Sequence, residues 1–202
     1  MNKVIIYSCI LLFGFSLEAE PAWEFIDEKE GIQVFNRSVS GSPLKSVKGI
    51  VLIPAPIDKV LAVLEDVSKT PRWLYNSRHA STLKQINIVE RVDYIITNMP
   101  WPVWDRDVII RSVFQQNRLT KQVEIKFSSE PNWVALRPGI VRVRKMTGRM
   151  LLTPQGKNGV QVLYEVSADP AGKLPKWLVN DMSFDFPFLS LKRLREVVKA
   201  TK

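Results

Sequence analysis

The sequence predicts an α+β domain in which one long, curved antiparallel sheet wraps around a helix at the C-terminal end of the chain. Two observations predict this architecture. Between residues 82 and 167, short runs of alternating apolar and polar residues follow one another with turn residues between them, as in hairpin-connected strands. Residues 175–199 instead carry apolar side chains at helical spacing. A sheet curved around such a helix encloses an internal apolar tunnel wherever side chains leave space.

The N-terminal end of the chain has a different character. Lys3 precedes an almost unbroken apolar run over residues 4–15, which is too short to cross a bilayer comfortably. We therefore expect residues 1–19 to be a cleaved signal peptide and residues 20–202 to form one domain. The protein would then be exported, to the periplasm if the source is bacterial and secreted otherwise. Two alternatives stay open: the segment is retained as an anchor, or Cys9 carries a lipid.

Composition limits the partners and the chemistry. The chain is 46% hydrophobic and has a net charge of +9, which removal of residues 1–19 leaves unchanged because Lys3 and Glu18 cancel. This charge attracts anionic phospholipid head groups, acidic polymers or nucleic acid, and export makes nucleic acid the least suitable partner. The mature chain would contain no cysteine, which excludes disulfides and thiol catalysis. We expect a monomer that contacts an anionic membrane surface transiently and binds no nucleic acid.

The first part of the domain is expected to hold two strands and a helix. The strands cover residues 31–37 and 44–53. Prolines at 54 and 56 end the second strand, because proline fixes its own φ and disfavours helix in the residue before it. Apolar residues then recur on one face of a helix over residues 57–66.

The middle of the domain is expected to be a meander of strands. Val123, Ile125 and Phe127 alternate with polar residues, so one face of that strand should meet solvent. Arg142 and Arg144 alternate with valines in the same way, which places them on a solvent face too. The expected strands are residues 82–89, 91–98, 107–114, 122–127, 141–152 and 160–167.

A long helix over residues 175–199 should end the chain. Pro187 is expected to kink or divide this helix, because proline lacks the N–H group that its turn requires. Basic residues gather in the last turns, which suits the helix dipole and an anionic membrane surface.

The residue types that catalysis requires are sparse. The single histidine, His79, lies in a polar segment, and no histidine–carboxylate spacing of the metal-binding kind occurs. Phosphate-binding glycine loops and nucleophile elbows are also absent from the sequence. The sequence therefore predicts a protein that is not an enzyme and holds no metal or organic cofactor. A buried acid–base pair could come only from Asp93, Tyr94 and Tyr164.

Aromatic residues provide the positive indication. Trp101 and Trp104 stand beside two prolines just before an expected strand, and Trp133 and Trp177 lie near other element ends. Aromatic side chains at the rim of a cavity can enclose an apolar ligand while their polar atoms stay wet. Each of them could equally be ordinary core.

Several short motifs resemble the START domain family, in the family's order and over nearly all of residues 20–202. Trp23 comes first and is followed by Gly31-Ile32-Gln33-Val34-Phe35, and Gly148 resembles the family's central glycine. The other matching segments are Pro56-Ile57-Asp58-Lys59-Val60, Arg72-Trp73, Pro100-Trp101-Pro102 followed by Arg106-Asp107-Val108, and Asp169-Pro170-Ala171-Gly172 running to Pro175-Lys176-Trp177.

The resemblance implies a helix-grip fold whose tunnel holds one lipid or sterol-like molecule and whose members are mostly binders and transporters. The wider superfamily also includes polyketide cyclases and hormone receptors, so the fold alone does not settle function. Many family members carry an arginine six residues after the motif arginine, inside the tunnel. Here that position is Ser112, and the neighbouring Arg111 should point to the opposite face of its strand.

Together these observations predict that the chain binds, and transports, a single lipid-like ligand in a tunnel gated by the C-terminal helix. A cyclase-type enzyme and a basic surface adaptor for membrane or acidic polymer are the alternatives. Arg72, Trp73, Arg106 and Asp107 are expected to be structural motif residues. The expected tunnel wall or gate residues are Tyr94, Ile96, Trp101, Val108, Ile110, Trp133, Tyr164, Val166, Met182, Phe184, Phe188 and Leu189.

Overall fold

The computed structural model describes residues 21–39, 45–172 and 174–201, and it confirms the expected α+β architecture. The strands are β1 (Glu24–Lys29), β2 (Ile32–Ser38), β3 (Lys45–Ile53), β4 (Ser77–Asn87), β5 (Glu90–Thr97), β6 (Asp105–Gln116), β7 (Val123–Ser129), β8 (Ile140–Arg142), β9 (Lys145–Pro154) and β10 (Val160–Asp169). The helices are α1 (Ile57–Glu65), the 3-10 turn η1 (Val67–Lys69), α2 (Thr70–Trp73) and α3 (Lys176–Ala200).

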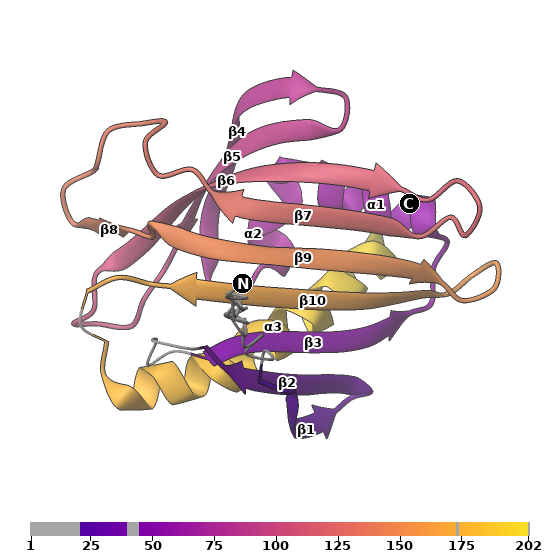
Figure 1. The fold of residues 1–202 in the computed structure, drawn as a ribbon, viewed down its shortest axis with the longest axis horizontal. Helices are drawn as coiled ribbons and strands as arrows, with labels where there is room; N and C mark the ends of the chain where they lie inside the picture. The colour runs from indigo at the N-terminus through magenta and orange to yellow at the C-terminus, as the bar shows by residue number, and fades with distance from the viewer. Residues whose placement is uncertain (1–20, 40–44, 173, 202) are drawn as a thin grey trace, which may run out of the picture.

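The strands form one sheet in the order β1-β2-β3-β10-β9-β7-β6-β5-β4, with antiparallel pairing between all of these neighbours. The short strand β8 pairs in parallel with the start of β6. Figure 1 shows the helices gathered on one face of the curved sheet, with α3 passing behind β3 and β10. The pairing of β3 with β10 joins the first strands to the meander, so the sheet curves continuously around α3.

Three elements differ from expectation. β1 was not predicted, because its six residues are exposed and mostly charged and it pairs only with β2 at the sheet edge. The strand expected over residues 141–152 is divided into β8 and β9, because β8 pairs in parallel with β6, where the N–H group of Val143 donates to the carbonyl oxygen of Asp107, whereas β9 pairs with β7 and β10. Pro187, which was expected to kink or divide the last helix, lies inside α3, so the division does not occur.

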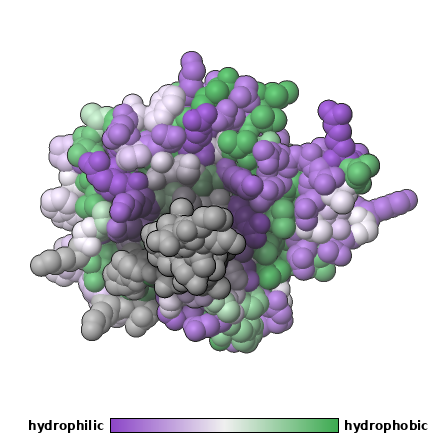
Figure 2. Space-filling view, viewed as in Figure 1, coloured by the Kyte–Doolittle hydropathy of each residue, from purple (hydrophilic) through white to green (hydrophobic). Residues whose placement is uncertain are grey.

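The main core lies between the inner, helix-covered face of the sheet and the helices. Its largest fully buried members include Ile32, Ile53 and Leu152 from strands and Leu191 and Leu194 from α3. A second, smaller cluster lies on the outer face of the sheet, and its buried members are Val92, Tyr94, Ile96 and Ile109. Val134, from the segment between β7 and β8, and Ile140 of β8 pack against this cluster. The rest of the outer face mixes hydrophilic and hydrophobic residues where it is visible (Figure 2). The interior that could hold a ligand is therefore on the α3 side.

Candidate functional site

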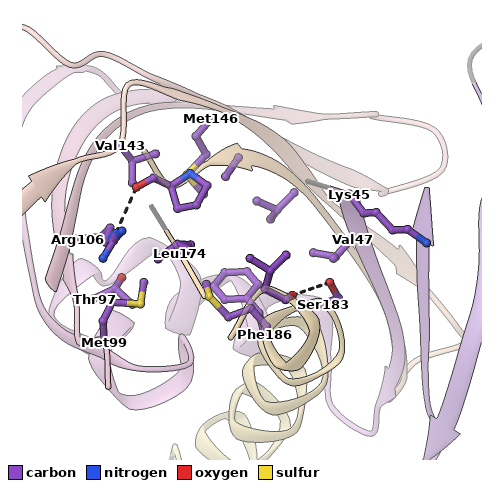
Figure 3. Close-up of a pocket in the computed structure, with 15 residues that line it drawn as sticks. Lys45, Val47, Thr97, Met99, Arg106, Val143, Met146, Leu174, Ser183 and Phe186 are labelled. Carbon is purple, nitrogen blue, oxygen red and sulfur yellow. Dashed lines mark hydrogen bonds between the residues drawn. The ribbon is translucent and has the colours of Figure 1, made fainter. Parts of the chain in front are cut away.

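A cavity of about 140 Å³, which we call the entrance chamber, lies between the sheet and the first turns of α3 (Figure 3). Its wall is mainly apolar, with Val47 and Val166 from strands and Phe186 from α3. The polar residues of the wall are Lys45, Thr97, Arg106 and Ser183, and its fifteen residues include no aspartate or glutamate. The remaining lining residues are Met99, Val143, Met146, Ala168, Pro170, Leu174, Val179 and Met182.

A second cavity of about 70 Å³, the deep chamber, lies further along the inner face. It contains a buried ion pair in which Nε of Arg91 lies 2.7 Å from Oδ2 of Asp93. The terminal nitrogens of Arg91 donate to the carbonyl oxygens of Leu64 and Glu65, so Arg91 also caps the last turn of α1. Nε1 of Trp73, in the same wall, is buried without an acceptor among the described residues.

An aromatic partition separates the two chambers. The ring of Phe186 lines the entrance chamber, the ring of Tyr164 lines the deep chamber, and their centroids are 6.0 Å apart. Phe127 packs 6.1 Å from Tyr164, and Gly148 makes room for it, because a Cβ at Gly148 would collide with the Phe127 ring. The tunnel that the resemblance implies is therefore divided here. Each chamber is smaller than the roughly 300 Å³ at the low end of ligand pockets.

An outer groove of about 430 Å³ adjoins the entrance chamber at the start of α3. The groove and the chamber share Thr97, Met99, Met182 and Phe186, which places the groove at the chamber's outer side. Burial and the nearby charge of Asp181 raise the pKa of Asp185, which also lines the groove, and Lys29 opposes the rise.

Exposed tryptophans surround this end of the molecule. Trp101 is 91% exposed and Trp104 63% exposed in the loop between β5 and β6. Trp133 follows β7 and is 46% exposed, and Trp177 in the first turn of α3 is 52% exposed. Figure 1 places these loops and the start of α3 at its left end.

The motif residues Arg106 and Asp107 point to opposite faces of β6. Arg106 is on the inner face, where it donates to the carbonyl oxygens of Trp104, Pro170 and Ala171. Asp107 is on the outer face, where Arg142 binds both of its carboxylate oxygens at 2.6 and 2.9 Å. These hydrogen bonds raise the pKa of Arg142.

The Asp107–Arg142 pair fixes the segment between β7 and β8. Arg142 also donates to the carbonyl oxygens of Pro131, Val134 and Ala135. The hydroxyl of Tyr94 donates to Asp107 at 2.9 Å, and burial together with this bond raises the pKa of Tyr94. Arg142 was expected on a solvent face and is instead buried. The sequence gives no signal for this, because the burial of its partner Asp107 is visible only in the structure.

The structure places the other expected site residues in three groups. Val166 and Met182 line the entrance chamber, Ile110 and Tyr164 line the deep chamber, and Trp73 joins them there. The main core contains Val108, Phe184, Phe188 and Leu189, none of which lines either chamber. The exposed residues are Trp101, Trp133 and Arg72.

Tyr94 and Ile96 are corrections, because they lie in the outer cluster and cannot line a chamber on the inner face. Ile95, between them, is the inner-face residue and lines the deep chamber. Sequence reasoning also missed Val47, Met146 and Phe186, which are apolar residues without a distinguishing motif.

Ser112 and Arg111 lie on opposite faces of β6, as the sequence predicted. Ser112 lines the deep chamber, and Arg111 is on the outer face, where its Nε lies 2.5 Å from Glu90. Arg91 is the cross-strand partner of Ser112 on the inner face. The deep chamber therefore has one arginine in its wall, Arg91 of β5.

Within the described residues, no cluster of histidine, cysteine and carboxylate side chains could hold a metal ion. Among the helices of that same part of the chain, none is long and apolar enough to span a membrane.

Comparisons with known proteins agree with this geometry. Residues 16–202 match the START domain family. The chain is 31% identical over 177 residues to an uncharacterized protein of Pseudomonas aeruginosa, covering 88% of this chain and 87% of that protein. It is 25% identical over 165 residues to the phosphatidylcholine transfer protein of Bos taurus, covering 79% and 76% of the two chains.

Solved structures give the same result. A STAR-related lipid transfer protein fragment from Xanthomonas axonopodis superposes with a TM-score of 0.80 at 32% identity, covering 88% of this chain and 98% of that one. The Zhui aromatase/cyclase from Streptomyces superposes with a TM-score of 0.51 at 14% identity, covering 76% and 93%. At that identity the likeness to the cyclase concerns the fold alone.

Proposed function

Because the chain belongs to the START domain family, we propose that it binds one lipid-like molecule between the sheet and α3 and carries it between membranes. The observation that carries this proposal is the pair of largely apolar chambers on the inner face of the sheet. The entrance chamber lies beneath the first turns of α3, the deep chamber lies beneath α1 and α2, and the rings of Phe186 and Tyr164 meet between them. Burial of apolar surface contributes about 25 cal/mol per Å², so a lipid chain can be held there without many polar contacts.

The ligand enters by displacing part of the wall. A chamber of about 140 Å³ is close in size to a cavity that holds one benzene molecule, so a lipid chain requires the two chambers to merge. Rotation of Phe186 away from Tyr164 would join them, and Phe186 belongs to α3. Movement of a helix packed through side chains leaves the sheet hydrogen bonds intact, so α3 is the gate.

The tryptophan-rich end is the part that meets the membrane. Tryptophan concentrates at the boundary between lipid and water because its ring is apolar and its N–H group stays hydrated. The basic last turns of α3 contribute less than the sequence suggested, because Lys192 and Arg195 both contact Glu30, with Nζ of Lys192 at 2.6 Å. This pairing also weakens the alternative of a basic surface adaptor.

Binding rather than catalysis fits the inner face. Of the three acid–base candidates, Tyr94 lies on the opposite face of the sheet. Asp93 is held by Arg91 and by the hydroxyl of Thr82. Burial raises the pKa of Tyr164, so its hydroxyl stays protonated. A cyclase-type reaction would need a proton donor and acceptor that face one chamber together.

Export completes the proposal. Residues 1–19 lie outside the described residues, and their sequence is that of a signal peptide. Lipid transfer would then take place in the periplasm of a bacterium or outside a eukaryotic cell. Amino-terminal sequencing of the protein recovered from the exporting cell tests this point: a mature chain that begins near residue 20 supports it, and an intact Met1 contradicts it.

The test of binding is mass spectrometry of lipid that remains with the protein when it is purified without detergent. We expect one lipid-like molecule per chain. Val166→Phe, which fills the entrance chamber, should weaken lipid binding about tenfold, equivalent to about 1.4 kcal/mol. The matched control is Ile140→Phe in the outer cluster, which should leave binding unchanged. No lipid in the purified protein, and none bound on addition, would contradict the proposal.

A further inference from the structure

Two arginines, Arg106 and Arg142, are buried on the strands of this sheet, and a third, Arg91, is largely buried; only Arg106 lacks an acidic partner among the described residues. Arg142 is paired with Asp107, and Arg91 is paired with Asp93. Arg106 is only 4% exposed, as is Arg142, yet it makes no ion pair with any described carboxylate. Its contacts are the carbonyl oxygens of Trp104, Pro170 and Ala171.

This arrangement leaves a buried positive charge without a counter-ion. An arginine keeps its charge in proteins, and removing a charge from water costs several kcal/mol unless it is paired. Burial lowers the pKa of Arg106, the direction that an unfavourable environment for the cation produces. The adjacent carboxylate of Asp105 opposes this lowering only in part, because it makes no ion pair with Arg106 and is itself paired with Arg78 at 3.0 Å and accepts from the N–H group of Met99.

Arg106 is also part of the wall of the entrance chamber. A guanidinium group has five N–H donors, and the three carbonyl contacts use one donor on each nitrogen. One donor on each terminal nitrogen therefore remains. Lys45, the other cation of this wall, lies across the chamber from Arg106, and Figure 3 shows its ammonium group pointing away from the chamber. Lys45 is also 3.5 Å from Glu24 and needs no further partner.

We propose that the entrance chamber binds the anionic head group of its lipid, a carboxylate or a phosphate, with Arg106 as the counter-ion. This inference rests on the proposed lipid binding and adds the class of head group and the direction of the ligand. The head group lies beside Arg106, and the chain runs past Phe186 and Tyr164 toward the deep chamber. The carbonyl contacts hold the guanidinium in place, so the same side chain also braces the segment after β10.

The orientation of the lipid follows from the charges in the two chambers. The described wall of the entrance chamber has one unpaired cation, Arg106, and no carboxylate, whereas the deep chamber already contains Asp93, whose charge Arg91 balances. A second anion in the deep chamber would meet Asp93, and an anion in the entrance chamber would meet no like charge among the described residues. Charge-assisted hydrogen bonds to arginine are about twice as strong as neutral ones, which favours the entrance chamber.

The test compares lipids that differ only in the charge of the head group, using delipidated wild-type protein at pH 7. The two pairs are oleate with methyl oleate, and oleoyl lysophosphatidate with monooleoylglycerol. We expect each anionic member to bind at least about tenfold more tightly than its neutral counterpart, equivalent to about 1.4 kcal/mol. Inorganic phosphate alone should neither bind nor compete at millimolar concentration, because the apolar chain supplies most of the affinity.

Variants assign the preference to one residue. Arg106→Gln should reduce the anionic preference to less than about threefold, and Arg106→Lys should retain part of it because the charge remains. Arg111→Gln, which removes an exposed arginine from the outer face of the same strand, is the matched control and should keep the full preference. Thermal unfolding of each variant reports the bracing role separately.

Four results of these binding experiments would each overturn a stated part of the proposal. Equal binding of charged and neutral members by the wild type overturns the head-group assignment and leaves lipid binding intact. Absence of binding by all four lipids overturns both proposals. Binding of inorganic phosphate as tight as that of lysophosphatidate makes the site one for a free anion and overturns the lipid assignment. An unchanged preference in a folded Arg106→Gln protein shows that Arg106 only braces the loop.

Discussion

The two halves of α3, on either side of Pro187, are packed in different ways. In the C-terminal half Leu191, Leu194 and Val198 are fully buried against the sheet. In the N-terminal half, Met182, Ser183 and Phe186 are only partly buried and line the chamber or the groove. The C-terminal half is therefore part of the core, whereas the N-terminal half borders the entrance chamber and the outer groove and reaches the core through Phe184 and Phe186.

The boundary between the halves is also the weakest place in the helix backbone. Pro187 has no N–H group, so the carbonyl oxygen of Ser183 loses its usual helical partner. The hydroxyl of Ser183 instead donates to the carbonyl oxygen of Val179 at 2.9 Å, a bond that often bends helices. A helix built in this way can lift its first turns while its last turns hold the sheet, which is the movement that the proposed gating of lipid entry requires.

The largest expected effect comes from removing a side chain of the anchored half. Leu191→Ala should lower the free energy of unfolding by about 2–5 kcal/mol, because it creates a cavity in a fully packed site. Met182→Ala, the matched change in the other half, should cost less than about 1 kcal/mol, because Met182 already borders a cavity. Urea unfolding of delipidated protein measures both values. Similar costs for the two variants would remove the distinction between the halves.

A smaller effect is expected from forcing the anchored half away from the sheet. A Cβ added at Gly49 in β3 would lie 2.5 Å from Cδ1 of Leu191 and 3.2 Å from Cβ of Pro187. Gly49→Ala should therefore destabilise the protein by about 1–3 kcal/mol through overpacking. Urea unfolding checks the cost, and amide hydrogen exchange should show faster exchange in the last turns of α3. Wild-type stability would mean that the whole helix shifts easily.

The smallest effect concerns the charge of the covering half. Asp185 has a raised pKa in the folded protein, so the folded state binds its proton more tightly than the unfolded state does. The free energy of unfolding should therefore fall as pH rises from the ordinary carboxyl pKa through the raised value, and the loss is complete above it. Asp185→Asn should flatten this slope. Urea unfolding between pH 4 and pH 7 measures the change, and identical slopes for both proteins would contradict it.

The sequence predicted the order of the main strands and of the last helix, but it did not predict which face of the sheet some strand residues occupy. Period-2 alternation placed Val123, Ile125 and Phe127 correctly on one face, because that strand has a single apolar side. β5 is apolar on both sides, since a second cluster covers its outer face, so alternation could not tell Tyr94 and Ile96 from Ile95.

The candidate site depended on contacts between distant residues, which periodicity does not encode. Arg142 resembled a surface residue until its pairing with Asp107, 35 residues earlier, was visible. The partition between the chambers arises where Phe186 of α3 meets Tyr164 of β10. The sequence predicted Tyr164 for the tunnel wall but did not single out Phe186, so it could not show that the two rings divide the interior.

The most direct measurement compares two tethers, one for each half of α3, in a chain that also carries Cys9→Ser. Met99→Cys with Met182→Cys joins the covering half to the loop after β5, because both methionines line the chamber and the groove. Glu30→Cys with Lys192→Cys joins the anchored half to the turn after β1, where the native side chains already touch. A thiol-cleavable cross-linker closes each pair, and the rate of fluorescent lipid transfer between vesicles is recorded before and after cleavage.

The account predicts that the first tether slows transfer at least about tenfold, about 1.4 kcal/mol in activation free energy, and that cleavage restores the rate. The second tether should leave the rate unchanged. Transfer that is equally fast with the first tether closed, or slowed as much by the second tether, would contradict the claim that the N-terminal half of α3 is the gate.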